Sequence, residues 1–493
     1  MPGLARRVPV DTAWFLGMNC MDSLIDHAFL SRLQFAVTAM FHIVWPVLTI
    51  GLSLFLVTVE TLWIRTGDTD YYHHARFWSR LLLLNFGIGV VSGIPLEFEF
   101  GTNWAPFSIA SGDFFGNILG FEGAMAFMLE AGFLGIMMFG WRRVAPGIHL
   151  FATVMVALGA SLSAFWIMVA NAWMQTPAGV HLESGKVVVD SYFDAIFNPA
   201  MLTSVSHMWF ACLETSLFVI GGISAWYIFR KRHVAFFLKS FRLTLLVGVI
   251  VTPLQILIGD ASGVVMAEYQ PAKLAATEAH WQTNPPGHGA AWALLAWPDA
   301  ANARNRWSIE IPYALSLITT HTPTGQVKGL RDFPPQDRPP VLIPFYAFRV
   351  MVIIGMALFA LMLWTLWAWR RGALSAARIS AQRRLLMAWI AAIPLGYIAV
   401  EMGWLTREVG RQPWVVHGLL RTRDAVSILP AAVVGTSLAL YVVVYTGLLV
   451  AFIVFARRLI HTGPDLDAPV PQYLGGAPIR TEPGAVLGDT RSS

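Results

Sequence analysis

Nine long apolar runs divide the amino-acid sequence, and they constrain its fold more than any other feature. A helix rises about 1.5 Å per residue, so each run is long enough to cross a hydrocarbon layer of about 30 Å. Only 13% of the 493 residues are charged, against about 25% in soluble domains. The chain is therefore predicted to be an all-α polytopic membrane protein with nine transmembrane helices. These lie near residues 33–62, 78–100, 114–141, 149–174, 203–229, 241–260, 343–369, 386–408 and 428–456.

Lysine and arginine in the short loops predict the orientation, because cytoplasmic loops carry the excess of positive charge. The loops after the first, third, fifth, seventh and ninth helices are basic. By contrast, residues 101–112 contain no Lys or Arg, and 175–202 contain only Lys186. The N-terminus is thus predicted to be periplasmic and the C-terminus cytoplasmic. Four arginines on the outer side break the rule, which indicates that they pair with anionic groups. They are Arg407, Arg411, Arg421 and Arg423.

The predicted helices divide the chain into five segments. These are an N-terminal extension (1–30), helices one to six (31–260), a long periplasmic loop (261–342), helices seven to nine (343–460) and a disordered cytoplasmic tail (461–493). The net charge of +5 does not indicate nucleic-acid binding, since the basic residues lie in loop clusters. Cys20 and Cys212 are too few for a disulfide framework, and Cys212 is expected in the core.

Four side chains with the chemistry of haem axial ligands fall at one depth on four different helices. His42 lies on the first helix and His207 near the start of the fifth. Met351 lies near the start of the seventh, and Glu408 ends the eighth. Because successive helices alternate in direction, all four are predicted in the outer half of the bilayer. Each alone could be a core histidine, a gap-filling methionine or an interfacial carboxylate, but together they indicate haem ligation.

The remaining histidines lie mostly in loops, which bears on other kinds of redox centre. A haem–copper centre needs several additional intramembrane histidines, so no copper is predicted. Two other classes of protein stay open. One is a membrane carrier of electrons through b haems, which usually uses His/His pairs that this chain lacks. The other is a proton-coupled transporter.

Buried carboxylates on the third helix suggest proton transfer. Glu122 and Glu130 lie about 12 Å apart along it, and Ser163 on the fourth helix could join them through water. A proton relay is favoured over two neutral glutamates that bond across helices. Glu97 and Glu99 end the second helix at the outer surface, where either could be merely solvated.

The sequence resembles subunit I of cytochrome bd-type quinol oxidases from about residue 30 to residue 458. The segments that carry the resemblance are 31–36 (SRLQFA) with 41–42 (FH), 97–104 (EFEFGTNW), 221–226 (GGISAW), 273–278 (KLAATE), 348–351 (FRVM) and 410–414 (GRQPW). The stretch between residues 314 and 348 is short, which is similar to the branch often called cyanide-insensitive oxidases.

The resemblance implies three haems and their ligands. His207 and Met351 would ligate a low-spin b haem, with Arg349 near it. His42 and Glu408 would serve two high-spin haems, one of b type and one of d or b type, in either assignment. Trp404 would lie between the haems. Glu97 is also expected among the residues that bind the haems.

The resemblance also implies the rest of the reaction. Lys273 and Glu278 would form a quinol site in the outer loop, while Glu122, Glu130 and Ser163 would carry protons from the cytoplasm. The implied enzyme oxidises quinol outside and reduces O2 to water with cytoplasmic protons, so that a proton gradient forms without pumping. Members lie in the bacterial cytoplasmic membrane as heterodimers with subunit II, often with a single-span small subunit.

Overall fold

The computed structural model describes residues 27–471, 473–474 and 477–478 of the chain. The predicted extension up to residue 26 and the predicted tail beyond residue 478 lie outside the described residues. Cys20 lies in the extension and is not described, whereas Cys212 is buried as expected.

Within the described residues, nine helical segments are long and apolar enough to cross a membrane, which confirms the predicted polytopic helical class. Seven are single helices: α2 (His27–Thr66), α3 (Thr69–Gly101), α6 (Pro146–Gln175), α8 (Met201–Phe229), α9 (Val234–Tyr269), α12 (Leu342–Arg370) and α16 (Ala431–Thr462). The third segment joins α4 (Ala105–Phe121), the π-helical turn η1 (Glu122–Phe127) and α5 (Met128–Phe139). The eighth joins α13 (Arg383–Ala392) and α14 (Leu395–Val409), which part at Pro394, a residue without a backbone donor.

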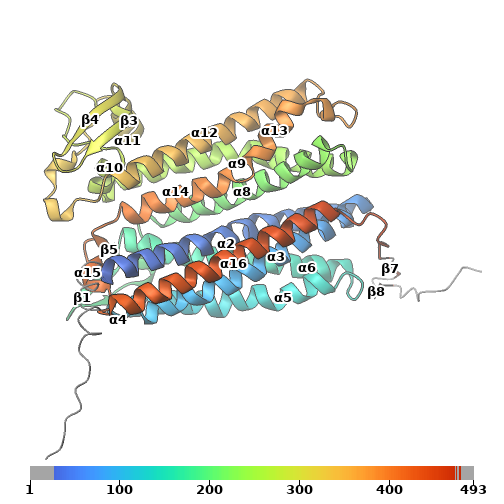
Figure 1. The fold of residues 1–493 in the computed structure, drawn as a ribbon, viewed down its shortest axis with the longest axis horizontal. Helices are drawn as coiled ribbons and strands as arrows, with labels where there is room; N and C mark the ends of the chain where they lie inside the picture. Colours follow the sequence, from blue (N-terminus) through green and yellow to red (C-terminus); the bar gives the residue numbers. More distant parts are fainter. Residues whose placement is uncertain (1–26, 472, 475–476, 479–493) are drawn as a thin grey trace, which may run out of the picture.

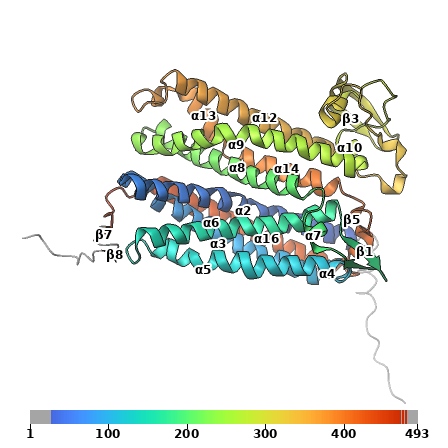
Figure 2. The same cartoon turned by 180° about the vertical axis from the view of Figure 1, so that it is seen from behind.

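The helices form two side-by-side groups (Figures 1 and 2). One group contains α8, α9, α12, α13 and α14, and the other contains α2, α3, α4–α6 and α16. Helix α2 joins them, because it packs against both α3 and α8.

The end of the bundle that carries the elements between the helices is called here the loop end. It has three antiparallel hairpins, β1 (Val180–Glu183) with β2 (Lys186–Val189), β3 (Trp292–Asp299) with β4 (Arg304–Ile311), and β5 (Trp414–Val416) with β6 (Leu420–Arg421). The short helices there are α7 (Tyr192–Ile196), α10 (Pro271–Thr277), α11 (Ala314–Thr320) and α15 (Thr422–Ala425). The turns η2 (Leu330–Asp332) and η3 (Pro335–Asp337) complete the long loop, which begins later than predicted because α9 continues to Tyr269.

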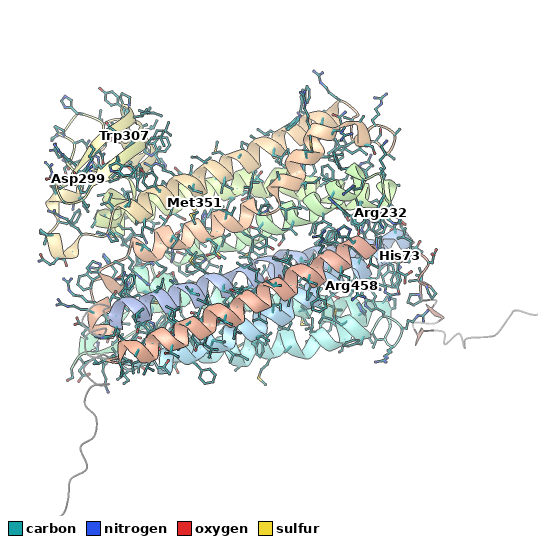
Figure 3. All side chains as sticks on the ribbon, viewed as in Figure 1. His73, Arg232, Asp299, Trp307, Met351 and Arg458 are labelled. Atoms are coloured by element: carbon teal, nitrogen blue, oxygen red, sulfur yellow. The ribbon has the colours of Figure 1, made fainter. Side chains whose placement is uncertain are left out.

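The opposite end is called here the arginine end. Arg232 and Arg458 lie there in Figure 3, far from Asp299 and Trp307 of the β3–β4 hairpin. The turn η4 (Ile379–Ala381) and a short pairing of β7 (Tyr473–Leu474) with β8 (Ala477–Pro478) also follow helix ends there. Helix α2 begins at the loop end and α16 ends at the arginine end, as an odd number of crossings requires.

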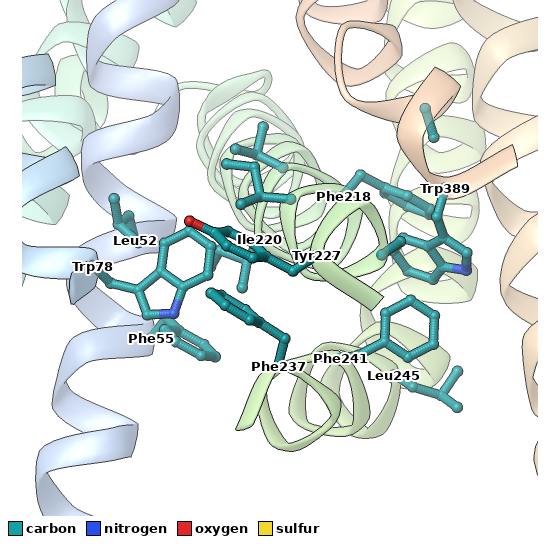
Figure 4. Packing of buried hydrophobic residues seen from close by; sticks show 14 of the residues in the cluster. Leu52, Phe55, Trp78, Phe218, Ile220, Tyr227, Phe237, Phe241, Leu245 and Trp389 are labelled. Atoms are coloured by element: carbon teal, nitrogen blue, oxygen red, sulfur yellow. The ribbon is translucent and has the colours of Figure 1, made fainter. Parts of the chain in front are cut away.

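Aromatic packing holds the two groups together toward the arginine end (Figure 4). Between the groups, Phe77 of α3 meets Phe237 of α9 edge to face with ring centroids 5.6 Å apart. Within one group, Tyr227 stacks on Phe237 at 3.8 Å, and Phe218 stacks on Trp389 at 4.9 Å. Helices α8 and α13 approach closely at Gly221, where a Cβ would lie 2.4 Å from the Trp389 ring. Small residues permit such close helix contacts in membranes.

Candidate functional site

His42 of α2 is held by α3. Its Nδ1 lies 3.0 Å from Oγ of Ser92, which donates its own proton to the carbonyl of Gly89 at 2.9 Å. Ser92 therefore accepts a hydrogen bond from the N–H group at Nδ1, which leaves Nε2 with a lone pair for a metal. The imidazole packs against Gly93, where a Cβ would lie 3.0 Å from Cε1.

His207 of α8 and Met351 of α12 also face glycines. A Cβ at Gly259 of α9 would lie 3.3 Å from Cε1 of His207, whose Nδ1 has no hydrogen-bond partner among the described residues. A Cβ at Gly403 of α14 would lie 3.1 Å from Sδ of Met351. Figure 3 shows Met351 in the half of the bundle nearer the loop end.

Each of these three candidate ligands thus lies beside a helix position that has no side chain. Imidazole nitrogens and a methionine thioether are suitable axial ligands for haem iron. These donor atoms, and the glycines that leave room beside them, therefore fit porphyrin groups between the helices.

Glu408 ends α14 inside a polar cluster. One carboxylate oxygen, Oε1, accepts hydrogen bonds from Asn171 at 2.9 Å and Gln175 at 3.3 Å, both on α6. The other, Oε2, pairs with Arg411, while Arg407 lies 3.9 Å from Oε1 and donates to Asn171.

Positive charge exceeds negative charge around Glu408. Arg407, Arg411 and Lys273 all act electrostatically on this one carboxylate. Within the described part of the chain, Nη2 of Arg407 and both Nε and Nη1 of Arg411 are buried without a hydrogen-bond partner. The cluster can therefore accept further anionic groups, such as the carboxylates of a haem.

The other two outer arginines find protein carboxylates. Arg421 pairs with Asp337 and stacks over Trp414 at 4.3 Å, and Arg423 lies 3.5 Å from Asp424. With the contacts of Arg407 and Arg411 to Glu408, these pairs confirm the prediction that the four arginines pair with anionic groups.

Lys273, at the start of the long loop, reaches the Glu408 cluster. Its Nζ donates to Gln175 at 2.9 Å and to Gln270 at 3.3 Å. Burial, with the charge of Arg407, holds the pKa of Lys273 well below its ordinary value.

Glu278 faces a different partner, Arg349 of α12. Oε2 of Glu278 lies 2.6 Å from Nη2 of Arg349, which also donates to the carbonyl of Ala293. The guanidinium lies 4.4 Å from the ring centroid of Phe345. Burial raises the pKa of Glu278, although the charge of Arg349 opposes the shift. The two predicted quinol residues therefore have separate partners.

The predicted proton relay begins with a direct contact. Ser163 donates to Oε1 of Glu122 at 2.6 Å, so no water is needed between them. The π-helical turn η1 starts at Glu122, and such turns are frequent at functional sites. Glu130, three residues beyond this turn, is 6% exposed and its Oε1 has no partner among the described residues.

Two neighbouring glutamates of α3 have different surroundings. Glu97 is exposed, whereas Glu99 is only 1% exposed. The expectation that Glu99 could be merely solvated is wrong, because α2 and α16 cover it. Trp404, the predicted link between haems, packs against the apolar cluster that includes Val400 and Cys212, and its buried Nε1 has no partner in the described part of the chain.

Sequence reasoning missed the amides that hold Glu408. Asn171 and Gln175 are four residues apart, one helical turn, in an otherwise apolar stretch. That spacing of two polar side chains was the available signal. Ser92, the partner of His42, offered no comparable pattern.

The fold and these side chains define a class of protein, a multi-pass membrane protein built to hold porphyrin groups between its helices. The profile of the family described as "Cytochrome bd terminal oxidase subunit I" matches residues 30–464. The chain belongs to this family, and like its members it is a multi-pass protein of the bacterial inner membrane.

Similar proteins cover nearly the whole chain. Cytochrome bd-II ubiquinol oxidase subunit 1 of Escherichia coli is 33% identical over 88% of this chain and 96% of its own length. Cytochrome bd ubiquinol oxidase subunit 1 of Bacillus subtilis is 36% identical over 81% of this chain and 86% of its own. The structure of bd oxidase from Geobacillus thermodenitrificans matches with a TM-score of 0.81 at 34% identity, covering 89% of this chain and 99% of that one.

Proposed function

We propose that this chain is the haem-bearing subunit of a terminal quinol oxidase that oxidises quinol on the periplasmic side and reduces O2 to water with cytoplasmic protons. The observation that carries the proposal is the pairing of three candidate ligands with glycines, His42 with Gly93, His207 with Gly259 and Met351 with Gly403. When bound, haem supplies one-electron redox centres and an open iron position for oxygen chemistry.

The low-spin b haem is assigned to His207 and Met351. Their helices, α8 and α12, both pack against α9 and α14. His42 and Glu408 are assigned to the two high-spin haems, one of b type and one of d or b type. Arg407 and Arg411 bind anionic haem substituents, Trp404 lies between the haems, and Glu97 contributes to the same region.

Quinol is proposed to bind at the loop end, where Lys273 lies in α10 and Glu278 directly follows this helix. Quinol loses protons as it loses electrons. Glu278, with a raised pKa, is suited to accept one of those protons. Arg349 holds its carboxylate in place, and Lys273 binds the head group from the side of Gln175.

The proposed sidedness rests on charge. Basic loops mark the arginine end as cytoplasmic, so the loop end faces the periplasm. Glu130, Glu122 and Ser163 carry protons from the arginine end toward the oxygen site. Protons released by quinol leave at the other end, and a gradient forms without a pump.

The proposed assembly is a heterodimer with subunit II, often joined by a single-span small subunit. Helix α16 supports this, because few of its residues are buried and apolar side chains such as Val443 (69% exposed) and Leu440 (60%) face outward. Lipid and partner helices would cover such faces.

The test is spectroscopy of the purified complex. A pyridine haemochrome spectrum should show haem, and carbon monoxide should shift the spectrum of the reduced protein because a high-spin iron has an open position. Quinol should drive oxygen consumption. A colourless protein would favour a proton-coupled transporter. Haem that does not bind carbon monoxide would favour a membrane electron carrier.

A further inference from the structure

Polar side chains line the contact of α2, α3 and α16 near the loop end. We call this contact the polar seam, and its members are Gln34, Thr38, Ser92, Glu99, Tyr441 and Tyr445. Helix α16 packs against both other helices. Across the seam, Ser437 of α16 donates to Oε1 of Gln34 at 2.7 Å.

Glu99 is the acidic group of the seam. It is 1% exposed, and neither carboxyl oxygen has a hydrogen-bond partner among the described residues. Thr38 and Gln34 face it from α2. The Thr38 hydroxyl, however, donates to its own helix, at 3.1 Å to Gln34 and 3.0 Å to Phe35.

No basic side chain of the described residues balances Glu99. The titratable groups that act on it from α16 are Tyr441 and Tyr445, and its other neighbours Thr38 and Gln34 are neutral. An unpaired buried carboxylate is costly, so we expect ordered water beside this group when it is ionised, and uptake of a proton relieves the cost. Two further buried polar atoms near the same helix ends, Oγ of Ser31 and Nδ2 of Asn103, also have no partner in the described chain, which supports water there.

The seam leads from Glu99 to His42. Glu99 and Ser92 are seven residues apart, so they share a face of α3 about two turns from each other. Tyr445 lies near Glu99 and donates to the carbonyl of Ser92 at 3.1 Å. Ser92 in turn is the hydrogen-bond partner of His42 at 3.0 Å.

The outer end of the seam is close to water. Helix α3 ends at Gly101, two residues after Glu99. The proton relay of Glu122, Ser163 and Glu130 belongs to different helices, α4–α5 and α6. Glu99 is therefore placed to exchange protons with the aqueous phase at the loop end.

We propose that Glu99 takes up one proton from the aqueous phase at the loop end when the haem held by His42 gains one electron. This inference rests on the proposed function. The electron comes from quinol, the proton forms the O–H bond of a carboxylic acid, and both leave again on oxidation. No net proton crosses the membrane. Negative charge added near an unpaired carboxylate in a medium of low dielectric favours this uptake.

The experiment is a redox titration of the purified oxidase complex, combined with infrared difference spectroscopy in H2O and D2O. The midpoint potential of the His42-dependent haem should fall with rising pH in the wild type. Full coupling gives about 59 mV per pH unit, a tenfold change in proton activity at one electron. A carboxyl C=O band that shifts in D2O should appear on reduction.

Three variants assign these signals. Glu99→Gln should flatten the pH dependence and remove the band, whereas Glu99→Asp should keep the dependence and move the band. Glu183→Gln removes the carboxyl group of a side chain that is 71% exposed at the same end of the bundle, and it should change neither signal. An unchanged slope and band in Glu99→Gln would overturn the inference.

A fourth variant separates this inference from the function on which it rests. His42→Ala should lose one haem, and full haem content in this variant would refute the proposed ligand.

If Glu99→Gln does not assemble, the Glu99→Asp complex tests the inference instead. A carboxyl band that stays in place there would also overturn the inference.

Discussion

Arg349 and Glu278 form an ion pair in which the two side chains are only 4% and 5% exposed, although they are 71 residues apart in the sequence. The pair ties the part of α12 nearer the loop end to the end of α10. It thereby connects the candidate low-spin haem region around Met351 with the proposed quinol site.

Arg349→Met should destabilise the protein strongly. Removing one partner of a buried pair leaves the other charge uncompensated, which costs about 3–5 kcal/mol. Arg423→Met is a control, because Arg423 lies 3.5 Å from Asp424 with the two side chains 79% and 57% exposed, and an exposed pair contributes about 1 kcal/mol or less. Thermal unfolding in detergent measures both. Equal losses would contradict the importance of the buried pair.

The stability contributed by Glu278 should depend on pH. Its pKa is raised in the folded protein, so the folded state binds the proton more tightly than the unfolded chain, where the pKa is about 4.3. The contribution is complete below that value and is lost as pH rises toward the folded pKa. Wild-type stability relative to Glu278→Gln should therefore fall with rising pH over this window. A difference that grows with pH would show that the sign is wrong.

Met351→Ala should convert the low-spin haem to a high-spin one that binds carbon monoxide, because the thioether that would hold the iron is removed. Met356→Ala serves as control, since Met356 lies on the same helix and is 51% exposed. Optical spectra of the reduced proteins, with and without carbon monoxide, measure the change. An unaltered spectrum in Met351→Ala would reject this ligand.

Gly93→Ala should disturb the haem held by His42. The new Cβ would lie 3.0 Å from Cε1 of His42, so the imidazole must move by a few tenths of an ångström. Gly87→Ala adds a methyl group on the same helix where nothing lies within 4 Å. We expect reduced haem content or a shifted spectrum in the first variant alone. Identical spectra in both variants would argue against a role of the Gly93–His42 contact in haem binding.

Glu130→Gln should slow oxygen reduction about a hundredfold, the lower end of the range for a positioned proton-transfer group. Reduction of the haems by quinol in the absence of oxygen should continue, because it needs no protons from the arginine end. Stopped-flow spectroscopy separates the two rates. Glu310→Gln, an exposed change in β4, is the control. Loss of both rates together would point to a structural defect.

Much of the architecture could be predicted from the sequence because a bilayer allows few solutions. Backbone polar groups must be paired inside each segment, so long apolar runs become helices. Counting those helices also placed His42, His207, Met351 and Glu408 in one half of the bundle. The break at Pro394 and the π-helical turn at Glu122 were not predicted, because hydropathy reports length and composition rather than hydrogen-bond pattern.

The partners of the site residues could not be predicted in this way. Asn171 meets Glu408 across 237 residues, and Lys273 and Glu278 turn to different neighbours despite lying five residues apart. Such contacts depend on how each helix is rotated about its axis. Apolar residues surround many of these helices on all sides, so no amphipathic stripe reveals the rotation.

By itself, the sequence determined the number of candidate crossings and the basic end of the bundle, and it predicted a common depth for the four candidate ligands, since these follow from the thickness of the bilayer and the spacing along each helix. Only the tertiary structure decided that glycines face His42, His207 and Met351, that basic side chains crowd around Glu408, and that Glu99 is buried. Those relationships arise where separate helices pack, and packing depends on shapes and rotations that a linear order of residues does not specify.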